Sequence, residues 1–233
     1  MMMVDYIMSL DQAAPDRQAL PLRGTYVTAV PEAENGKGGY LLRAAYTDRG
    51  RGALGSLTSE KIIALRNPSL NVEAADVEQG TQLLTTPRRS FNVVEDGGFV
   101  GYEGLDLTGI GEIVIGAEAS DRSGAAGGVI EVRVGGPDGD VIGKTEKVVH
   151  QEVDFSAELQ KRREAWEAAG KKGPEPNIWQ LRQQMRPTWT VPLGDVDGVH
   201  DVYFVFRNPD IKPGQILVQL QSIEFKPVNQ LSR

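Results

Sequence analysis

The chain has 233 residues, of which 40% are hydrophobic and 24% charged, which suits a globular protein with a substantial core. Its net charge of −7 argues against a nucleic-acid partner, because such proteins present a basic face. The sequence contains no cysteine, which excludes disulfides, zinc–thiolate sites, iron–sulfur clusters and haem held by a C-x-x-C-H motif. No apolar run is long enough to span a bilayer, so no membrane span is expected.

The first 19 residues are predicted to be a short helix and a linker left from a preceding domain. Val4, Ile7 and Met8 have helical spacing, and residues 11–18 are polar with one proline. The segment lacks the charged region and cleavage site of a signal peptide. If the protein is exported, we expect its signal to belong to a longer parent.

Residues 20–69 are predicted to supply extra β-strands. Strand-like runs occur at residues 24–29, 39–47 and 61–65, and a glycine-rich turn lies at 48–52. This segment is too short to keep a core of its own, so we expect it to pack on the domain that follows.

Residues 70–228 carry a denser set of predicted strands, separated by glycine and proline clusters. These strands are expected at residues 99–107, 112–117, 128–134, 188–191, 200–206 and 216–225. Many short strands with turn signals are typical of an all-β, antiparallel β-sandwich jelly roll. The side chains expected to point inward are Val132, Val202, Phe204, Phe206, Leu220 and Phe225. A break in alternation near Gln221 and Ser222 predicts a bulge.

Residues 154–186 interrupt the strands and predict a short helical insertion. Ser156 is a candidate N-cap for the first helix, and Gly170 is its candidate stop. Asn177 is expected to cap a second helix. Trp166 and Trp179 are expected either to pack between these helices and the sandwich or to expose a patch.

The residues that could carry catalysis do not form a recognisable set, so we expect a protein that is not an enzyme. His150 and His200 belong to no zinc motif, and His200 is expected to bond to a turn at the start of its strand. Asp195, Asp197 and Asp201 do not have EF-hand spacing, and Asp197 followed by glycine indicates a turn.

Aromatic residues are few, which makes Tyr102 and Trp189 the main candidates for stacking on a sugar ring. The alternative for both is packing in the core.

The strand sequence from residue 70 to 226 resembles family 6 carbohydrate-binding modules. The resemblance is carried by five segments in order: VEAAD (72–76), GGFVGY (97–102), GGVIEVR (127–133), GVHDVYFVF (198–206) and SIEF (222–225). It implies a non-catalytic β-sandwich that holds polysaccharide or oligosaccharide.

The same resemblance implies site residues. Tyr102, Trp189 and Asn208 match positions that contact the sugar, and Glu73 matches a carboxylate that holds a structural calcium ion. Ala75 and Gln221 replace two other acidic residues of that calcium motif, so we expect no metal to be needed for folding.

Residues 4–10 resemble the last helix of a class I c-type cytochrome domain, and residues 39–68 resemble the segment that joins such a domain to a carbohydrate-binding-like module. The resemblance implies a bacterial cytochrome or sugar-dehydrogenase-like parent, periplasmic or extracellular, with haem only in a missing parent domain.

Two functions stay open. One is a carbohydrate-binding module that targets a secreted redox or sugar-active parent to polysaccharide. The other is a structural or docking module, with a degraded sugar cleft, that contacts other domains of the parent.

Overall fold

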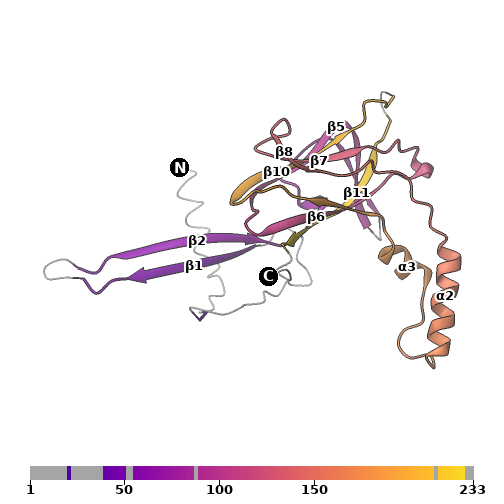
Figure 1. Ribbon diagram of the computed structural model, residues 1–233, viewed down its shortest axis with the longest axis horizontal. Helices are drawn as coiled ribbons and strands as arrows, with labels where there is room; N and C mark the ends of the chain where they lie inside the picture. The colour runs from indigo at the N-terminus through magenta and orange to yellow at the C-terminus, as the bar shows by residue number, and fades with distance from the viewer. Residues whose placement is uncertain (1–19, 22–38, 51–54, 87–88, 213–214, 229–233) are drawn as a thin grey trace. The chain divides into compact units, whose positions relative to one another are not determined.

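The computed structural model describes residues 20–21, 39–50, 55–86, 89–212 and 215–228 (Figure 1). The chain divides into two compact units, Met1–Ala33 and Glu34–Arg233, and only Leu20 and Pro21 of the first are described. The helix expected at residues 1–10 and the strand expected at 24–29 lie outside the described residues. In chain order the strands and helices are β1 (Gly39–Thr47), β2 (Thr58–Arg66), β3 (Ser69–Asn71), β4 (Val77–Thr86), β5 (Arg89–Asp106), β6 (Ile110–Glu118), β7 (Val129–Val134), β8 (Asp140–Lys144), α2 (Phe155–Ala168), α3 (Ile178–Gln184), β9 (Thr188–Pro192), β10 (Val199–Arg207) and β11 (Val218–Pro227).

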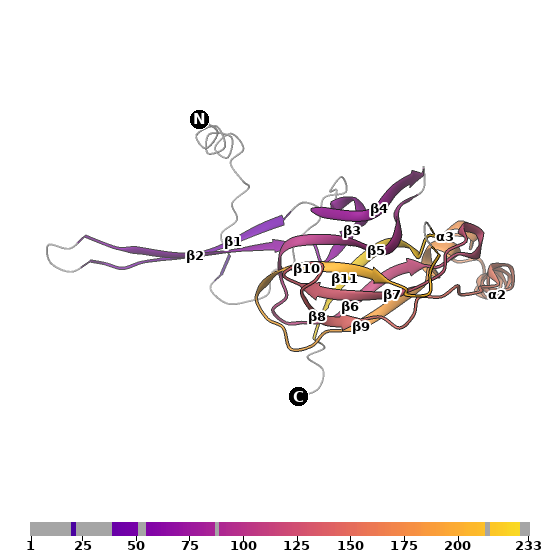
Figure 2. The same ribbon diagram turned by 90° about the horizontal axis from the view of Figure 1, so that it is seen from above.

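The long strand β5 joins two antiparallel layers. Its C-terminal half pairs with β10 and continues into β7 and β8, whereas its N-terminal half pairs with β11 and continues into β6 and β9. β4 runs along the other edge of β5. Figure 2 shows these strands from above. One hydrophobic cluster holds side chains from both halves. The predicted all-β, antiparallel sandwich with a helical insertion is therefore confirmed.

The side chains predicted to face inward do so. All six lie in the core cluster, and ring contacts connect Tyr102 to Phe204 and Phe204 to Phe225, with centroids 6.1 and 6.5 Å apart. The register of β11 shifts between Leu220 and Ser222, where the bulge was predicted.

The sequence did not predict β4, β8 or the first ten residues of β5. β4 is almost entirely exposed, so it lacks the hydrophobic alternation by which strands are found. Between the two halves of β5, Gly98 lies so close to β4 that an added Cβ would be 2.6 Å from the Gly80 carbonyl oxygen. The segment 72–76 differs as well, because Val72–Ala74 forms a 3₁₀ turn where the resemblance implied a first strand.

The hairpin of β1 and β2 forms a separate two-stranded sheet. Every residue of β1 is exposed, and in β2 only Ile63 and Arg66 are partly covered. Its described polar contact with the sandwich is at the end of β2, where Arg66 Nη1 donates to Asp76 Oδ2 at 2.8 Å. That residues 20–69 pack on the sandwich as extra strands stays a prediction; the described hairpin pairs only with itself and meets the sandwich at the end of β2.

The insertion forms the two predicted helices. Asn177 caps α3 as expected, since its Oδ1 accepts hydrogen bonds from the N–H groups of Trp179 and Gln180. Asp154 caps α2 in place of the expected Ser156. Gly170, with φ +76°, ends the first helix in a conformation that glycine favours. Within the described residues, no helix is long and apolar enough to cross a membrane.

Candidate functional site on the outer face of a five-stranded layer

Tyr102 does not form an exposed platform, which corrects the expectation for this residue. Its ring is 0% exposed and packs edge-on against Phe204, and its hydroxyl donates to the Asn71 carbonyl oxygen at 3.2 Å. Burial raises the pKa of the Tyr102 hydroxyl, and the charges of Asp76 and Glu78 add to this shift. Tyr102 is therefore a core residue, and a sugar has no access to its ring.

Trp189 and Asn208 are also held by structural contacts. The Trp189 indole N–H donates to the Ala117 carbonyl oxygen at 2.9 Å, and its half-buried ring packs against the core. Asn208 is 5% exposed, and its Nδ2 donates to the Gly127 carbonyl oxygen at 2.8 Å. It lies six residues beyond Val202, the partner of Tyr102, or about 20 Å along an extended strand. The structure does not bring Tyr102 and Asn208 into one cleft.

Glu73 lines a pocket of about 190 Å³ with Asn71, Ser90 and Gln221. The Gln221 Oε1 is buried and accepts no hydrogen bond from the described residues. One exposed carboxylate and one amide oxygen are chemically suited to a cation, but calcium takes six to eight oxygens, so the donors present fit a weak site at most. In the part of the chain that the structure describes, no group of three acidic or histidine side chains is placed to hold a metal ion.

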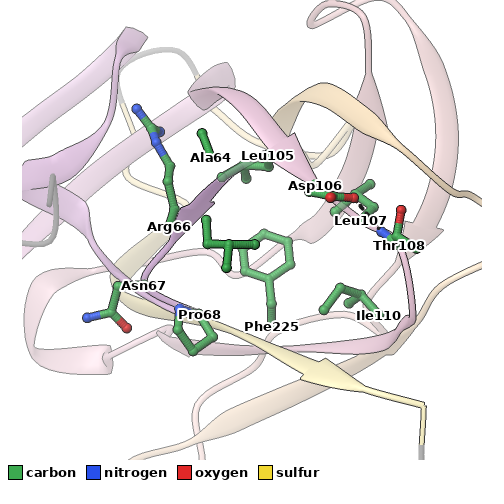
Figure 3. Close-up of a pocket in the computed structure, with 11 residues that line it drawn as sticks. Ala64, Arg66, Asn67, Pro68, Leu105, Asp106, Leu107, Thr108, Ile110 and Phe225 are labelled. Carbon is green, nitrogen blue, oxygen red and sulfur yellow. Dashed lines mark hydrogen bonds between the residues drawn. The ribbon is translucent and has the colours of Figure 1, made fainter. Parts of the chain in front are cut away.

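A second pocket, of about 230 Å³, lies where the end of β2 meets the sandwich (Figure 3). The Phe225 ring lies at its centre, whereas Arg66 and Asn67 point away from it. Asp106 accepts a hydrogen bond from the Thr108 N–H at 3.0 Å, and the hydrogen bonds from Thr108 lower the pKa of its carboxyl group. This pocket is therefore apolar, with polar groups at its margin that already have partners.

Two rows of residues run across the outer face of the layer β4-β5-β10-β7-β8, and Val205 within them is 0% exposed. The strand registers place five residues in each row. One row is Val77, Gly101, Tyr203, Arg133 and Val141, and the next is Gln79, Phe99, Val205, Glu131 and Lys144. These residues alternate with the inward-facing Val100, Val132 and Phe204, so both rows face away from the core.

Tyr203 and Phe99 form an aromatic pair on this face. Their rings meet edge-on with centroids 5.9 Å apart, and both side chains are half-buried. Gly101 lies beneath Tyr203, since a Cβ added there would be 2.8 Å from two atoms of the ring. The Tyr203 hydroxyl makes no hydrogen bond to any described residue, so it is available to a ligand.

Charged and amide groups surround the aromatic pair. Arg133 donates from Nε and Nη2 to Glu131 Oε2, at 3.0 and 2.7 Å, and from Nη1 to the Gly139 carbonyl oxygen. This places a fixed ion pair beside Tyr203 and Val205. Gln79 and Lys144 lie exposed at opposite ends of the Phe99 row and offer further hydrogen-bond donors.

The sequence of β10 alternates, and we interpreted it as a strand buried on both sides; the structure confirms this for Val205, whereas Tyr203 is only partly buried. Tyr203, Val205 and Arg207 alternate with Val202, Phe204 and Phe206, and the second set is in the core. His200 behaves as predicted, with its Nε2 2.8 Å from the Asp197 carbonyl oxygen. Asp201 accepts a hydrogen bond from the Gly104 N–H, which is a structural role.

No protein-family model matches this chain, and no curated protein sequence matches it. Among solved structures, it is similar to a family 6 carbohydrate-binding module from Clostridium cellulolyticum in complex with xylose. The identity is 20%, the TM-score is 0.46, and the match covers 68% of this chain and 95% of that chain. A β-1,3-glucan-binding module of the same family from Bacillus halodurans is 23% identical, with a TM-score of 0.47 and coverage of 69% and 97%. An arabinoxylan arabinofuranohydrolase from Bacillus subtilis, in complex with cellotetraose, is 15% identical, with a TM-score of 0.47 and coverage of 72% and 29%.

Proposed function

We propose that this chain is a non-catalytic carbohydrate-binding module whose site is the outer face built around Tyr203. The observation that carries the proposal is the Tyr203 ring, which lies over Gly101 beside Phe99 and whose hydroxyl has no hydrogen-bond partner among the described residues. A pyranose ring offers flat C–H faces and a rim of hydroxyl groups. A partly exposed aromatic ring with hydrogen-bonding groups around it matches both features.

The polar groups on this face suit binding better than catalysis. Glycoside hydrolysis needs two carboxyl groups on opposite sides of the bond to be cut. Glu131, the carboxylate in the two rows, is fixed by hydrogen bonds from Arg133. It orients a ligand as part of an ion pair and is not held as a general acid or base.

We further propose that binding serves a longer parent protein, periplasmic or extracellular, by holding it on polysaccharide. The support is the resemblance of residues 4–10 and 39–68 to a cytochrome helix and its connecting segment. Single glycan contacts are weak, and a tethered module gains from the effective concentration that the tether provides. Haem chemistry would belong to another domain of that parent.

Calorimetry with soluble xylan, cellulose-derived and β-1,3-glucan oligosaccharides tests the site. Tyr203→Ala is expected to lower the binding free energy by about 1–3 kcal/mol, because stacking on the ring is lost. Tyr203→Phe is expected to cost about 0.5–1.5 kcal/mol, the usual contribution of one hydrogen bond. Thr190→Ala, at an exposed position on β9, is the matched control and should leave the affinity unchanged. Binding that survives Tyr203→Ala together with Phe99→Ala would place the sugar elsewhere.

A docking module is the second candidate, and the β1–β2 hairpin favours it. Leu41 and Tyr46 are each 72% exposed and Ile62 is 53% exposed. An isolated two-stranded hairpin is marginally stable in water, and large exposed apolar side chains often mark an interface. Failure to bind any glycan, together with binding to a separately expressed parent domain that is lost on Leu41→Ser and Ile62→Ser, would favour docking.

A further inference from the structure

The insertion is a basic element on an acidic chain. Residues 154–186 carry seven Lys and Arg against five Asp and Glu, whereas the whole chain carries 25 against 32. The two helices lie beside each other (Figure 1), and α2 has no buried residue. Leu181, 1% exposed, anchors α3. This pair of helices therefore presents most of its side chains to solvent.

Three of these side chains form a stack. The Arg182 guanidinium lies 5.5 Å from the ring centroid of Phe155 and 5.5 Å from that of Trp179. Trp179 is 51% exposed, which is high for the largest apolar side chain. Cation–π contacts with two rings restrict the guanidinium, so it is held in place before any ligand arrives.

Arg182 is held by these rings and has no acceptor among the described residues, and this distinguishes it from the two arginines of α2. Arg162 pairs with Glu158, and Arg163 pairs with Glu175. Arg182 makes no hydrogen bond or ion pair with any residue that the structure describes. Its planar set of N–H donors therefore remains free for a carboxylate or a sulfate, which it can bind through two parallel hydrogen bonds.

We infer that Phe155, Trp179 and Arg182 form a second site, specific for an acidic sugar residue of an anionic polysaccharide. The exposed indole stacks on the C–H face of the pyranose, while Arg182 binds the acidic group at the edge of the same ring. An acidic peptide could meet the charge, but it offers no flat ring to Trp179. Like the proposed function, this second site binds a carbohydrate, and it rests on that function in this respect. It uses none of the residues around Tyr203.

Calorimetry of the whole chain with galacturonate and mannuronate oligosaccharides tests this site. The methyl-esterified galacturonate oligosaccharide is the matched ligand, because it keeps the rings and removes the charge. Arg182→Gln and Trp179→Ala are each expected to lower the affinity for the acidic ligand about tenfold or more. Arg182→Lys is expected to rescue binding only partly, since lysine keeps the charge and loses the planar pair of donors. Arg163→Gln removes a cation that already has a partner and should change the affinity less than about twofold.

Several results would overturn the inference. These are no binding of either acidic ligand, equal binding of the esterified ligand, or full affinity in Arg182→Gln. Equal competition by a polyglutamate peptide would show a charge-selective peptide surface instead. Tyr203→Ala separates the two sites, because it should weaken neutral glycans and leave the acidic ligand bound. Loss of both in that variant would mean a single site near Tyr203. Circular dichroism and the melting temperature of each variant check that the helices remain.

Discussion

The two faces of the layer β4-β5-β10-β7-β8 use aromatic residues in different ways. On the inner face Tyr102 is fully buried, touches Phe204, and donates its hydroxyl to Asn71. On the outer face Tyr203, which pairs with Gly101, is half-buried, and its hydroxyl bonds to no residue in the described ranges. Successive side chains of a strand point to opposite faces. Tyr102 follows Gly101 on β5, and Tyr203 pairs with Gly101 from β10. This offset of one residue places the Tyr102 ring in the core and the Tyr203 ring on the face where a ligand can bind.

The largest expected difference between the faces is in stability. Phe204→Ala should lower the free energy of unfolding by about 3–5 kcal/mol, because it leaves a cavity between the layers. Tyr203→Ala, at the residue before Phe204, should lower the free energy of unfolding by about 1 kcal/mol or less, since the Tyr203 ring is already partly hydrated. Urea denaturation of both variants measures the two values. Similar losses would mean that the outer face also packs against other parts of the protein.

Gly101→Ala tests whether the outer face depends on close packing over the glycine. The new methyl group would lie 2.8 Å from the Tyr203 ring and 2.7 Å from Val77, so both side chains must move. We expect a loss of about 1–3 kcal/mol in stability from overpacking. We also expect weaker glycan binding in calorimetry, because the ring is displaced. A stable variant with unchanged affinity would contradict this role for Gly101.

The buried hydroxyl of Tyr102 predicts a pH dependence of stability. Burial raises the pKa of Tyr102 in the folded protein, whereas the unfolded chain ionises near its ordinary value of about 10. Above that pH the folded state binds more protons than the unfolded state. Stability should therefore fall as pH rises above about 10.

Denaturation at pH 9, 10 and 11 compares the wild type with Tyr102→Phe. The variant lacks the ionisable group, so its stability should fall less steeply over this range. Thr190→Ala, which removes no ionisable group from an exposed position on β9, serves as the control and should keep the wild-type slope. Equal slopes in all three proteins would show that Tyr102 is not the source of the pH dependence.

The smallest expected effect concerns calcium at the pocket of Glu73 and Gln221. The donors present are too few for tight binding, so calcium or a chelator should change the melting temperature by no more than about 1 °C. Differential scanning calorimetry with and without chelator measures this. A large rise that Glu73→Gln removes would show that backbone oxygens complete a metal site.

Local patterns in the sequence determined much of this protein. Alternation in β10 identified the inward-facing Val202, Phe204 and Phe206, Gly170 identified the end of α2, and Asn177 identified the start of α3. These features are local because a strand repeats every two residues and a helix cap acts within one turn.

The tertiary structure alone decided which aromatic residues are accessible. In residues 99–102 both strand faces carry apolar side chains, so the sequence does not state which face meets the other layer. That choice is made by β10 and β11, which bring Phe204 and Phe225 from distant parts of the chain onto the side of Tyr102. The exposed strand β4 was missed for a related reason. Backbone hydrogen bonds to β5 fix the position of β4. These bonds do not require particular side chains, and the exposed residues of β4 therefore show no hydrophobic pattern.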